Sequence, residues 1–275
     1  NTSLVLGDAD TQIRLEALYL DATLATRQRL QLGSEFGATI QTRLRQQQLP
    51  QFDVTIKQHG NVEQDAFIVE IADSAESVKM GVEGIWNLVT GSGDGQLQLR
   101  SKDLSRFAKT VISPLNTLEL LQPGMEILSG NIALDTAFKR TNAERSHWTQ
   151  QSNLTLHGLS GRVDDYHFEK LALLANWSGL ERWKTVQPVE FSLEKLDLGF
   201  EVHNIVARLT LPQATAITKP SVRLEKFLAG MFGGQLFLPE PALWDFGAPI
   251  NTLTLRAQQW QLSDMVALQQ DKDIQ

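Results

Sequence analysis

Hydrophobic and polar side chains alternate along most of this chain with a period of two residues. Successive side chains of a β-strand point to opposite faces of a sheet, so this pattern indicates strands with one apolar face and one wetted face. Such one-sided strands are typical of antiparallel sheets. The clearest alternating segments are 52–57, 96–100, 131–139, 153–157, 205–211 and 252–256.

Two of the expected strands change the phase of this alternation midway. Phe191 and Leu193 share one parity, whereas the hydrophobic residues over 196–202 follow the other. The same slip separates residues 13–15 from the hydrophobic residues over 18–24. A slip of one residue is what a β-bulge produces, and bulges bend and twist a strand. We therefore expect long, strongly twisted strands.

Helical patterns are scarce. Residues 103–111 predict a short helix with Asp103 or Ser101 as its N-cap, and residues 263–268 predict another. Residues 225–230 fit either a helix or a strand. The expected fold is therefore mainly β, an antiparallel sheet of long and strongly twisted strands with a few short helices.

Composition narrows the function classes. The chain has 275 residues, 42% of them hydrophobic, which excludes a disordered chain. It has no cysteine, which excludes a disulfide scaffold, a thiol catalyst and a zinc–thiolate site. Its 25 Lys and Arg residues against 32 Asp and Glu residues give a net charge of -7, which argues against nucleic-acid binding.

No linker marks a domain boundary, so we expect a single elongated segment over 1–275 with a weak subdivision near 115–125. No apolar run approaches the roughly 18 to 20 residues that a membrane-spanning helix needs. Both ends of the chain are polar. We interpret the chain as a soluble piece of a longer protein.

Candidate catalytic and metal-binding motifs are weak. His147, His157 and His167 are spaced by ten residues, but no carboxylate has a recognisable metal spacing, so we expect solvated histidines and no metal site. The Gly-rich segment 91–95 lacks the Lys and Ser/Thr of a phosphate loop and predicts a hairpin turn. No Gly-x-Ser-x-Gly motif is present. We expect no enzyme activity and no cofactor.

Several segments of the second half resemble a known family. Residues 227–239, with the sequence FLAGMFGGQLFLP, are followed by Leu-Thr-Leu at 253–255 and by LSDMVAL at 262–268. Together with 156–168 and 189–205, this order resembles the AsmA-like bridge-type lipid transfer proteins, and within them the C-terminal part of the YdbH branch. The first half resembles that branch only in style. Older labels for the branch speak of dicarboxylate transport, which these residues do not support.

The resemblance implies a function and a location. Proteins of this kind are anchored in the inner membrane of Gram-negative bacteria and cross the periplasm as a β-sheet folded into a trough. The trough carries phospholipid toward the outer membrane, and the YdbH branch is paired with a small outer-membrane lipoprotein at its C-terminal end. The resemblance thus implies a periplasmic, non-enzymatic lipid-transfer segment with phospholipid as its transported ligand.

Physical reasoning leaves two arrangements open. A one-sided sheet must cover its apolar face, and the expected helices are too few to do so. Either the sheet curls and leaves a groove for acyl chains, or two halves close as a β-sandwich binding or assembly module. The candidate groove residues are Leu97, Leu99, Ile132, Leu134, Leu154, Leu156, Leu193, Leu198, Leu209, Leu236, Leu253 and Leu255. An exposed edge strand over 251–257 is expected to accept a partner strand.

Overall fold

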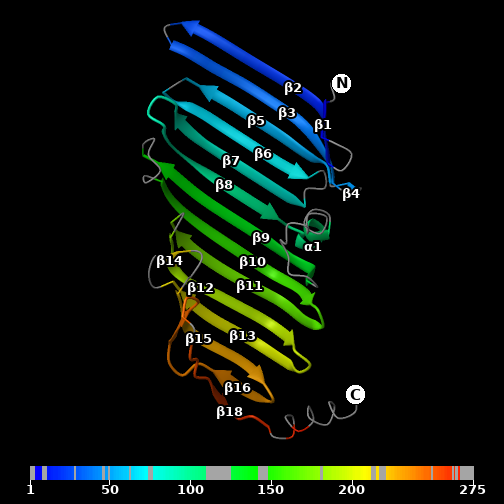
Figure 1. Cartoon of the computed structure of the whole chain (residues 1–275), viewed down its shortest axis with the longest axis vertical. Helices are drawn as coiled ribbons and strands as arrows, with labels where there is room; N and C mark the ends of the chain where they lie inside the picture. The colour runs from blue at the N-terminus through cyan, green and yellow to red at the C-terminus, as the bar shows by residue number, and fades with distance from the viewer. Residues whose placement is uncertain are drawn as a thin grey trace. The chain divides into compact units, whose positions relative to one another are not determined.

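The structure is a computed structural model of the chain (Figure 1). It is mainly β and antiparallel with very little helix, which confirms the predicted fold class in these respects. The residues that it describes are 4–7, 11–27, 29–44, 47–48, 50–61, 63–73, 77–109, 125–141, 148–179, 182–211, 215–216, 221–248, 250–261, 263 and 266.

The strands follow one another closely along the chain. In chain order they are β1 (Leu4–Gly7), β2 (Thr11–Arg27), β3 (Arg29–Leu44), β4 (Gln47–Gln48), β5 (Phe52–Gly60), β6 (Asp65–Asp73), β7 (Val78–Asn87), β8 (Ser92–Ser101), β9 (Met125–Arg140), β10 (Trp148–Val163), β11 (Tyr166–Ser178), β12 (Arg182–Asp197), β13 (Glu201–Thr210), β14 (Thr215–Ala216), β15 (Ser221–Met231), β16 (Gly234–Phe237), β17 (Ala242–Asp245) and β18 (Arg256–Gln258).

Neighbours in sequence are mostly neighbours in the sheet. Each long strand pairs antiparallel with the next, and the short strands β4 and β14 are bypassed by the pairs β3–β5 and β13–β15. At the end of the ladder, β15 pairs with β16 and β17, and β16 pairs with β18. This meander of hairpins is why a local alternation pattern suffices to build the sheet.

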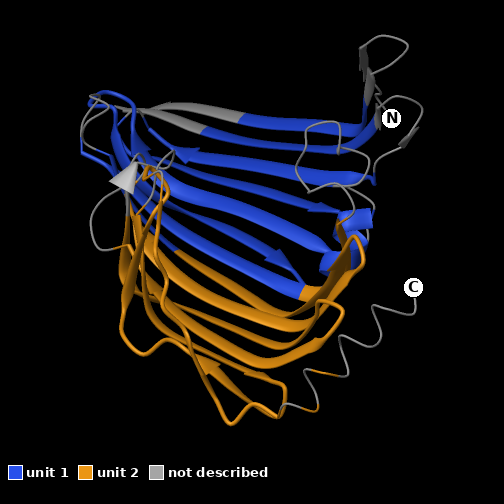
Figure 2. Ribbon diagram, turned by 60° about the horizontal axis from the view of Figure 1, so that its bottom comes forward, with its two compact units in different colours: residues 1–122, 131–152 blue, residues 123–130, 153–275 orange. Residues whose placement is uncertain are grey.

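The chain forms two compact units, which are coloured separately in Figure 2. Unit 1 comprises residues 1–122 and 131–152, and unit 2 comprises residues 123–130 and 153–275. Strands β9 and β10 pair with each other, and each has one part in unit 1 and another in unit 2. The two units are described separately below.

In unit 1, the predicted phase slip in the first long strand is a β-bulge. The register between β2 and β3 shifts between Glu16 and Tyr19. Ala17 lies at the shift with φ of 50°, in the left-handed region. Leu15 and Leu18 are therefore both half-buried although they are three residues apart.

In unit 2, the second predicted slip is present in the packing, but β12 keeps its register with β11 and β13 at this point. The bulge lies on β13, where the register with β15 shifts between His203 and Val206. Leu193 and Leu196 have opposite parity, yet both pack in one hydrophobic cluster with Val202 and Ile205. Asn204, opposite this point on β13, has φ of 51°. The local left-handed conformation lets hydrophobic residues on both sides of the bulge reach the same face.

The prediction that Leu198 continues the apolar face of this strand is wrong. β12 ends at Asp197, and Leu198 lies in the turn that leads into β13, where its N–H donates to Phe200 O at 3.1 Å. Its side chain is exposed. Two further candidates, Leu253 and Leu255, lie in a segment without strand, because β18 begins only at Arg256.

The first predicted helix is present over the described residues 104–109, with the last two in a wider helical turn, and residues 110 and 111 lie outside the described residues. α1 (Leu104–Phe107) begins after Asp103, whose Oδ1 accepts the Arg106 N–H and the Ser105 hydroxyl, both at 3.0 Å. The Arg106 N–H and then the Ser105 hydroxyl lower the pKa of Asp103, as is typical of an ionised N-cap. Residues 225–230 belong to strand β15. Most of the predicted helix at 263–268 lies outside the described residues.

The bulge at Asn204 makes a stability prediction. A β-branched residue fits poorly at positive φ, so Asn204→Val should lower the free energy of unfolding by about 1–2 kcal/mol. Asn204→Gly should change it by less than about 0.5 kcal/mol. Urea unfolding measures both values. Ser192→Val, at a regular exposed position of β12, is the control, and an equal effect of the two valines would contradict the bulge.

Candidate functional site

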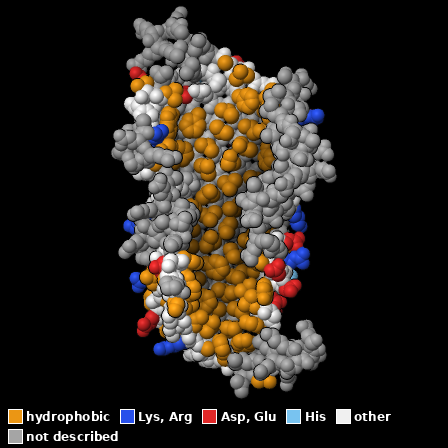
Figure 3. All heavy atoms as spheres, viewed as in Figure 1, with side chains coloured by type: hydrophobic (Ala, Val, Ile, Leu, Met, Phe, Trp, Pro, Cys, Tyr) orange, Lys and Arg blue, Asp and Glu red, His pale blue; other side chains and the backbone are white. Residues whose placement is uncertain are grey.

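The apolar face of unit 1 is built by one parity of strands β5–β9. In strands β6–β9 its central rows contain only hydrophobic residues, glycines and one threonine, and the hydrophobic side chains in them are half-buried rather than buried. Figure 3 shows hydrophobic side chains gathered on this face. From β6 to β9 the rows are Phe67–Gly84–Gly95–Phe138, Val69–Val82–Leu97–Thr136 and Ile71–Met80–Leu99–Leu134.

The opposite face of the same strands is charged. Lys79 Nζ lies 3.1 Å from Glu70 Oε1, and Arg100 pairs with Asp135. Gly81 lies between Glu70 and Gln98 on this face. The contrast between the two faces matches the alternation in the sequence, because neighbouring residues of one strand face opposite environments.

Polar groups border the apolar face at both ends of β6. Asp65, at 6% exposure, accepts a hydrogen bond from Gln58 Nε2 at 2.7 Å. Asp73, also buried, accepts the Ser77 hydroxyl at 2.5 Å and the Val78 N–H at 2.9 Å. The strand between them measures roughly 27 Å at about 3.4 Å per residue. The apolar face of unit 1 is thus a band of limited width between two polar borders.

Aromatic residues accompany the Asp65 border. The rings of Trp86 and Trp148 are 5.7 Å apart, and Phe138 is 6.1 Å from Trp148. The guanidinium of Arg140 lies 5.4 Å from the Trp148 ring and 6.0 Å from the Trp86 ring. Arginine and tryptophan both combine an apolar surface with polar groups, so this border is amphipathic rather than simply charged.

Two glycines let aromatic rings lie flat on the sheet of unit 1. A Cβ at Gly95 would be 2.5 Å from Glu83 O and 2.7 Å from the Phe138 ring. A Cβ at Gly84 would be 2.5 Å from Asp94 O and 3.0 Å from the Phe67 ring. Since no side chain stands between them, the Phe67 and Phe138 rings form part of the apolar floor.

The apolar face of unit 2 is more deeply buried than that of unit 1. Leu193, Val202, Ile205 and Ala229 form its buried cluster, with aromatic residues packed around them. The strands of this unit curve along their length in Figure 2. Curvature brings side chains of the inner face together, which explains the stronger burial without a covering helix.

A line of bulges crosses unit 2. Gly130, Gly158, Lys170 and Asn204 have φ of 133°, 63°, 54° and 51° and lie on β9, β10, β11 and β13. Positive φ is uncommon within strands, and four such residues, three on consecutive strands and the fourth on β13 beyond β12, indicate a shared bend. We call this set the bulge line.

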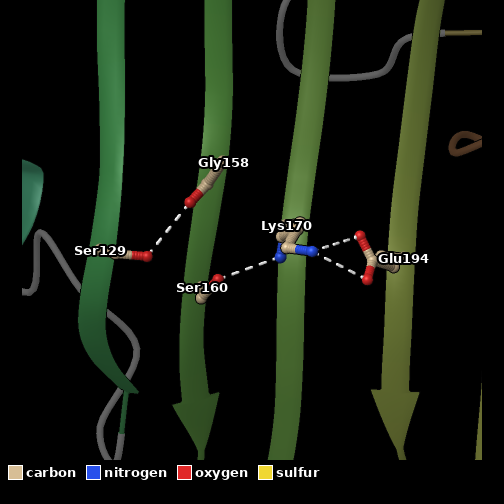
Figure 4. Close-up of polar contacts among 5 residues, drawn as sticks. All are labelled: Ser129, Gly158, Ser160, Lys170 and Glu194. Carbon is tan, nitrogen blue, oxygen red and sulfur yellow. Dashed lines mark hydrogen bonds and ion pairs between the residues drawn. The ribbon is translucent and has the colours of Figure 1, made fainter.

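Polar side chains form hydrogen bonds between neighbouring strands along the bulge line (Figure 4). The Ser129 hydroxyl donates to Gly158 O at 3.2 Å, and Ser160 Oγ accepts the Lys170 N–H at 3.0 Å. Lys170 Nζ donates to both carboxylate oxygens of Glu194 at 2.9 and 2.8 Å, and this contact raises the pKa of Lys170. The bend is thus held by polar side chains.

A hollow of about 460 Å³ lies on the polar face of unit 2. Its charged and polar lining includes His157, Glu190, Arg208 and Lys226. Among the residues that the structure describes, no group of three or more His, Asp or Glu side chains is arranged to hold a metal ion. His147, the first of the three spaced histidines, lies outside those residues.

Most of the predicted groove residues lie on the two apolar faces. Those in unit 1 are Leu97, Leu99, Ile132 and Leu134, and those in unit 2 are Leu154, Leu156, Leu193, Leu209 and Leu236. Leu198, Leu253 and Leu255 lie outside the strands, as described above. The prediction missed Phe67, Val69, Met80 and Val82, although residues 67–71 and 78–82 carry hydrophobic residues at every second position.

Comparisons with known proteins were made with the whole chain. A family model described as "YdbH-like: Intermembrane phospholipid transport protein YdbH" matches residues 2–275. No curated protein and no solved structure matches the chain. Among the described residues, no helix has the length and apolar character to span a membrane.

The close contacts that a side chain at Gly95 would make in unit 1 lead to a prediction about stability. Gly95→Ala places a Cβ against backbone and the Phe138 ring, so it should lower the free energy of unfolding by about 1–3 kcal/mol. Gly81→Ala meets nothing within 4 Å and should be neutral or stabilising by up to about 1 kcal/mol. Urea unfolding of the two variants measures both changes in the free energy of unfolding. Equal destabilisation would mean that Gly95 does not lie beneath the ring.

Proposed function

Because the chain belongs to the YdbH-like family of intermembrane phospholipid transport proteins, we propose that it is a non-enzymatic segment that shelters acyl chains on its apolar sheet faces between the inner and outer membranes. The observation that supports this most is the half-buried face of unit 1. Its central rows present hydrophobic side chains without a charged residue and remain accessible in the described part of the chain.

Such a face suits an acyl chain for a simple energetic reason. Transferring each methylene group from water onto an apolar surface is favourable by about 0.8 kcal/mol, and no directed polar partner is required. A lipid is therefore held by many weak and interchangeable contacts, so it can slide. Its charged head group would lose hydration on the apolar face and should stay at a polar border.

The Asp65 border of unit 1 supports this placement of the acyl chains on the apolar face and of the head group at its edge. Trp86 and Trp148 lie beside Arg140 there, next to the apolar rows. Indole rings favour the boundary between hydrocarbon and water. A lipid with its tails on the central rows would have its head group at such a boundary.

A closed β-sandwich binding module is the rival function, and an enzyme is a third. A closed module needs a buried core between two sheets, whereas the apolar side chains of unit 1 stay half-exposed. The family is one of lipid transport and not an enzyme family. Both observations favour a passive lipid carrier.

A charge on the apolar face tests the proposal. Leu134 lies in a central row of unit 1 opposite Leu99, and Leu134→Asp should reduce the phospholipid that copurifies with the protein at least about tenfold. Extraction followed by mass spectrometry measures the lipid. Ala137→Asp, on the charged face of the same strand, is the matched control and should keep its lipid.

Both variants should retain the wild-type circular dichroism spectrum. Loss of the fold in Leu134→Asp, with an intact Ala137→Asp, would favour the closed core of the rival module. Unchanged lipid in a folded Leu134→Asp would place the lipid elsewhere.

We further propose the envelope setting that the resemblance implies: a periplasmic segment of a chain anchored in the inner membrane, with a small outer-membrane lipoprotein adding a strand near the C-terminus. β18 supports the last point, because it is the last strand in the described part of the chain and its pairing with β16 uses one of its two edges. An unpaired edge is a template for strand addition.

The edge of β18 can be tested by photo-crosslinking. A photoreactive amino acid at Ala257, in the middle of β18, should crosslink to a small lipoprotein in cells, whereas one at Thr155 in unit 2 should not. Crosslinking only to other copies of this chain, or none from Ala257, would contradict strand addition at β18.

A further inference from the structure

Exposed hydrophobic side chains gather around β17 at the end of the ladder in unit 2. Leu243 and Trp244 on this strand are 56% and 40% exposed. Phe246 and Ile250 in the following turn are 62% and 81% exposed, and the rings of Trp244 and Phe246 are 6.5 Å apart. Several large exposed hydrophobic residues in one short segment are typical of an interaction site.

Phe246 and Ile250 lie in a turn that is held by its own hydrogen bonds. We call the described residues of this turn, 245–248, 250 and 251, the Asp245 loop. Asp245 Oδ1 accepts the Gly247 N–H at 2.8 Å, and Asp245 O accepts the Ala248 N–H at 3.0 Å. Asn251 closes the loop, since its Oδ1 accepts the Asp245 N–H at 2.8 Å and its Nδ2 donates to Asp245 O at 2.9 Å. The loop is therefore preorganised while its hydrophobic side chains point into water.

We propose that the Asp245 loop inserts into the surface of a phospholipid bilayer and docks unit 2 onto it. This inference rests on the proposed lipid-transfer function, in which lipid leaving the apolar face must enter a membrane. Residues 246–250 contain no charged side chain. Tryptophan, phenylalanine and isoleucine are side chains that partition into the boundary between head groups and acyl chains.

The hydrogen bonds of the loop favour a bilayer over a protein strand. Backbone groups that enter a membrane need internal partners, because hydrocarbon offers none. The Gly247 and Ala248 N–H groups already have such partners in Asp245. Strand addition needs the reverse, namely unpaired backbone groups, so the loop itself is a poor template for a partner strand.

Net charge bears on the choice of bilayer and on a second copy of the chain. At -7, two copies repel each other, which disfavours self-association through this loop. The same charge disfavours strongly anionic membranes. We therefore expect the loop to bind zwitterionic bilayers by hydrophobic insertion, with little dependence on salt.

Vesicle flotation tests the inference. The protein is mixed with phosphatidylethanolamine–phosphatidylcholine vesicles and the bound fraction is measured. Wild type should float with the vesicles, and Phe246→Ser with Ile250→Ser should weaken binding about 100-fold, about tenfold for each side chain. Leu88→Ser with Val89→Ser is the matched control, because this pair is 53% and 70% exposed in a turn of unit 1, and it should float like wild type.

A spectroscopic readout locates the contact without depending on the double variant. Lipids brominated near the head group should quench the fluorescence of bound wild type, and Trp244→Phe should remove most of that quenching. Equal quenching in Trp244→Phe, or equal flotation of the loop variant and wild type, would overturn the inference. The inference would also be overturned if wild type did not bind vesicles and the loop variant lost a self-association that wild type shows.

The experiments distinguish failure of the docking inference from failure of the proposed lipid-transfer function. The loop variant should retain its copurified phospholipid, because the apolar faces are unchanged. A wild-type protein that carries phospholipid but does not float overturns only the docking inference. A protein that floats but carries no phospholipid overturns only the lipid-carrier proposal.

Discussion

The constraint on which this structure depends is an apolar sheet face that the described part of the chain does not cover with helices. A one-sided sheet normally buries that face against a second layer. Here α1 is four residues long, and the central rows of unit 1 stay half-exposed. In unit 2 the same problem is reduced by curvature, which buries Leu193 and Ile205. An accessible hydrocarbon-like face is what a passive carrier of acyl chains requires, so the fold and the proposed function have one physical cause.

Several local features keep this face usable. Asp65 and Asp73 border it and accept side-chain or backbone hydrogen bonds at the ends of β6, and the charged opposite face keeps the sheet in water. Glycines flatten its floor under the aromatic rings of unit 1. In unit 2 the bulge line bends the strands, and Ser129, Ser160 and Lys170 supply hydrogen bonds along it. Each feature changes the shape or the border of the apolar face without placing a charge on its central rows.

The alternation pattern predicted much of this arrangement, because strand faces follow from parity alone. The slip in parity at 15–18 identified the bulge of β2. The slip at 193–196 identified the change of face, but the bulge itself lies on the neighbouring strand β13, between His203 and Val206. It failed where a strand ends: Leu198 keeps the parity of the following residues but lies in a turn, and Leu253 and Leu255 precede β18. Turn position depends on pairing with the next strand, which parity does not encode. The Asp245 loop also escaped prediction, because its exposure arises from tertiary placement.

The accessibility of the apolar face of unit 1 can be measured directly, because the chain contains no cysteine. Val82→Cys, in a central row, introduces a single thiol that a bulky maleimide can label under native conditions. The account predicts rapid labelling after phospholipid has been stripped and slow labelling when phospholipid is restored. Labelling that stays slow in both states, and becomes fast only on unfolding, would show a sealed core and contradict the account.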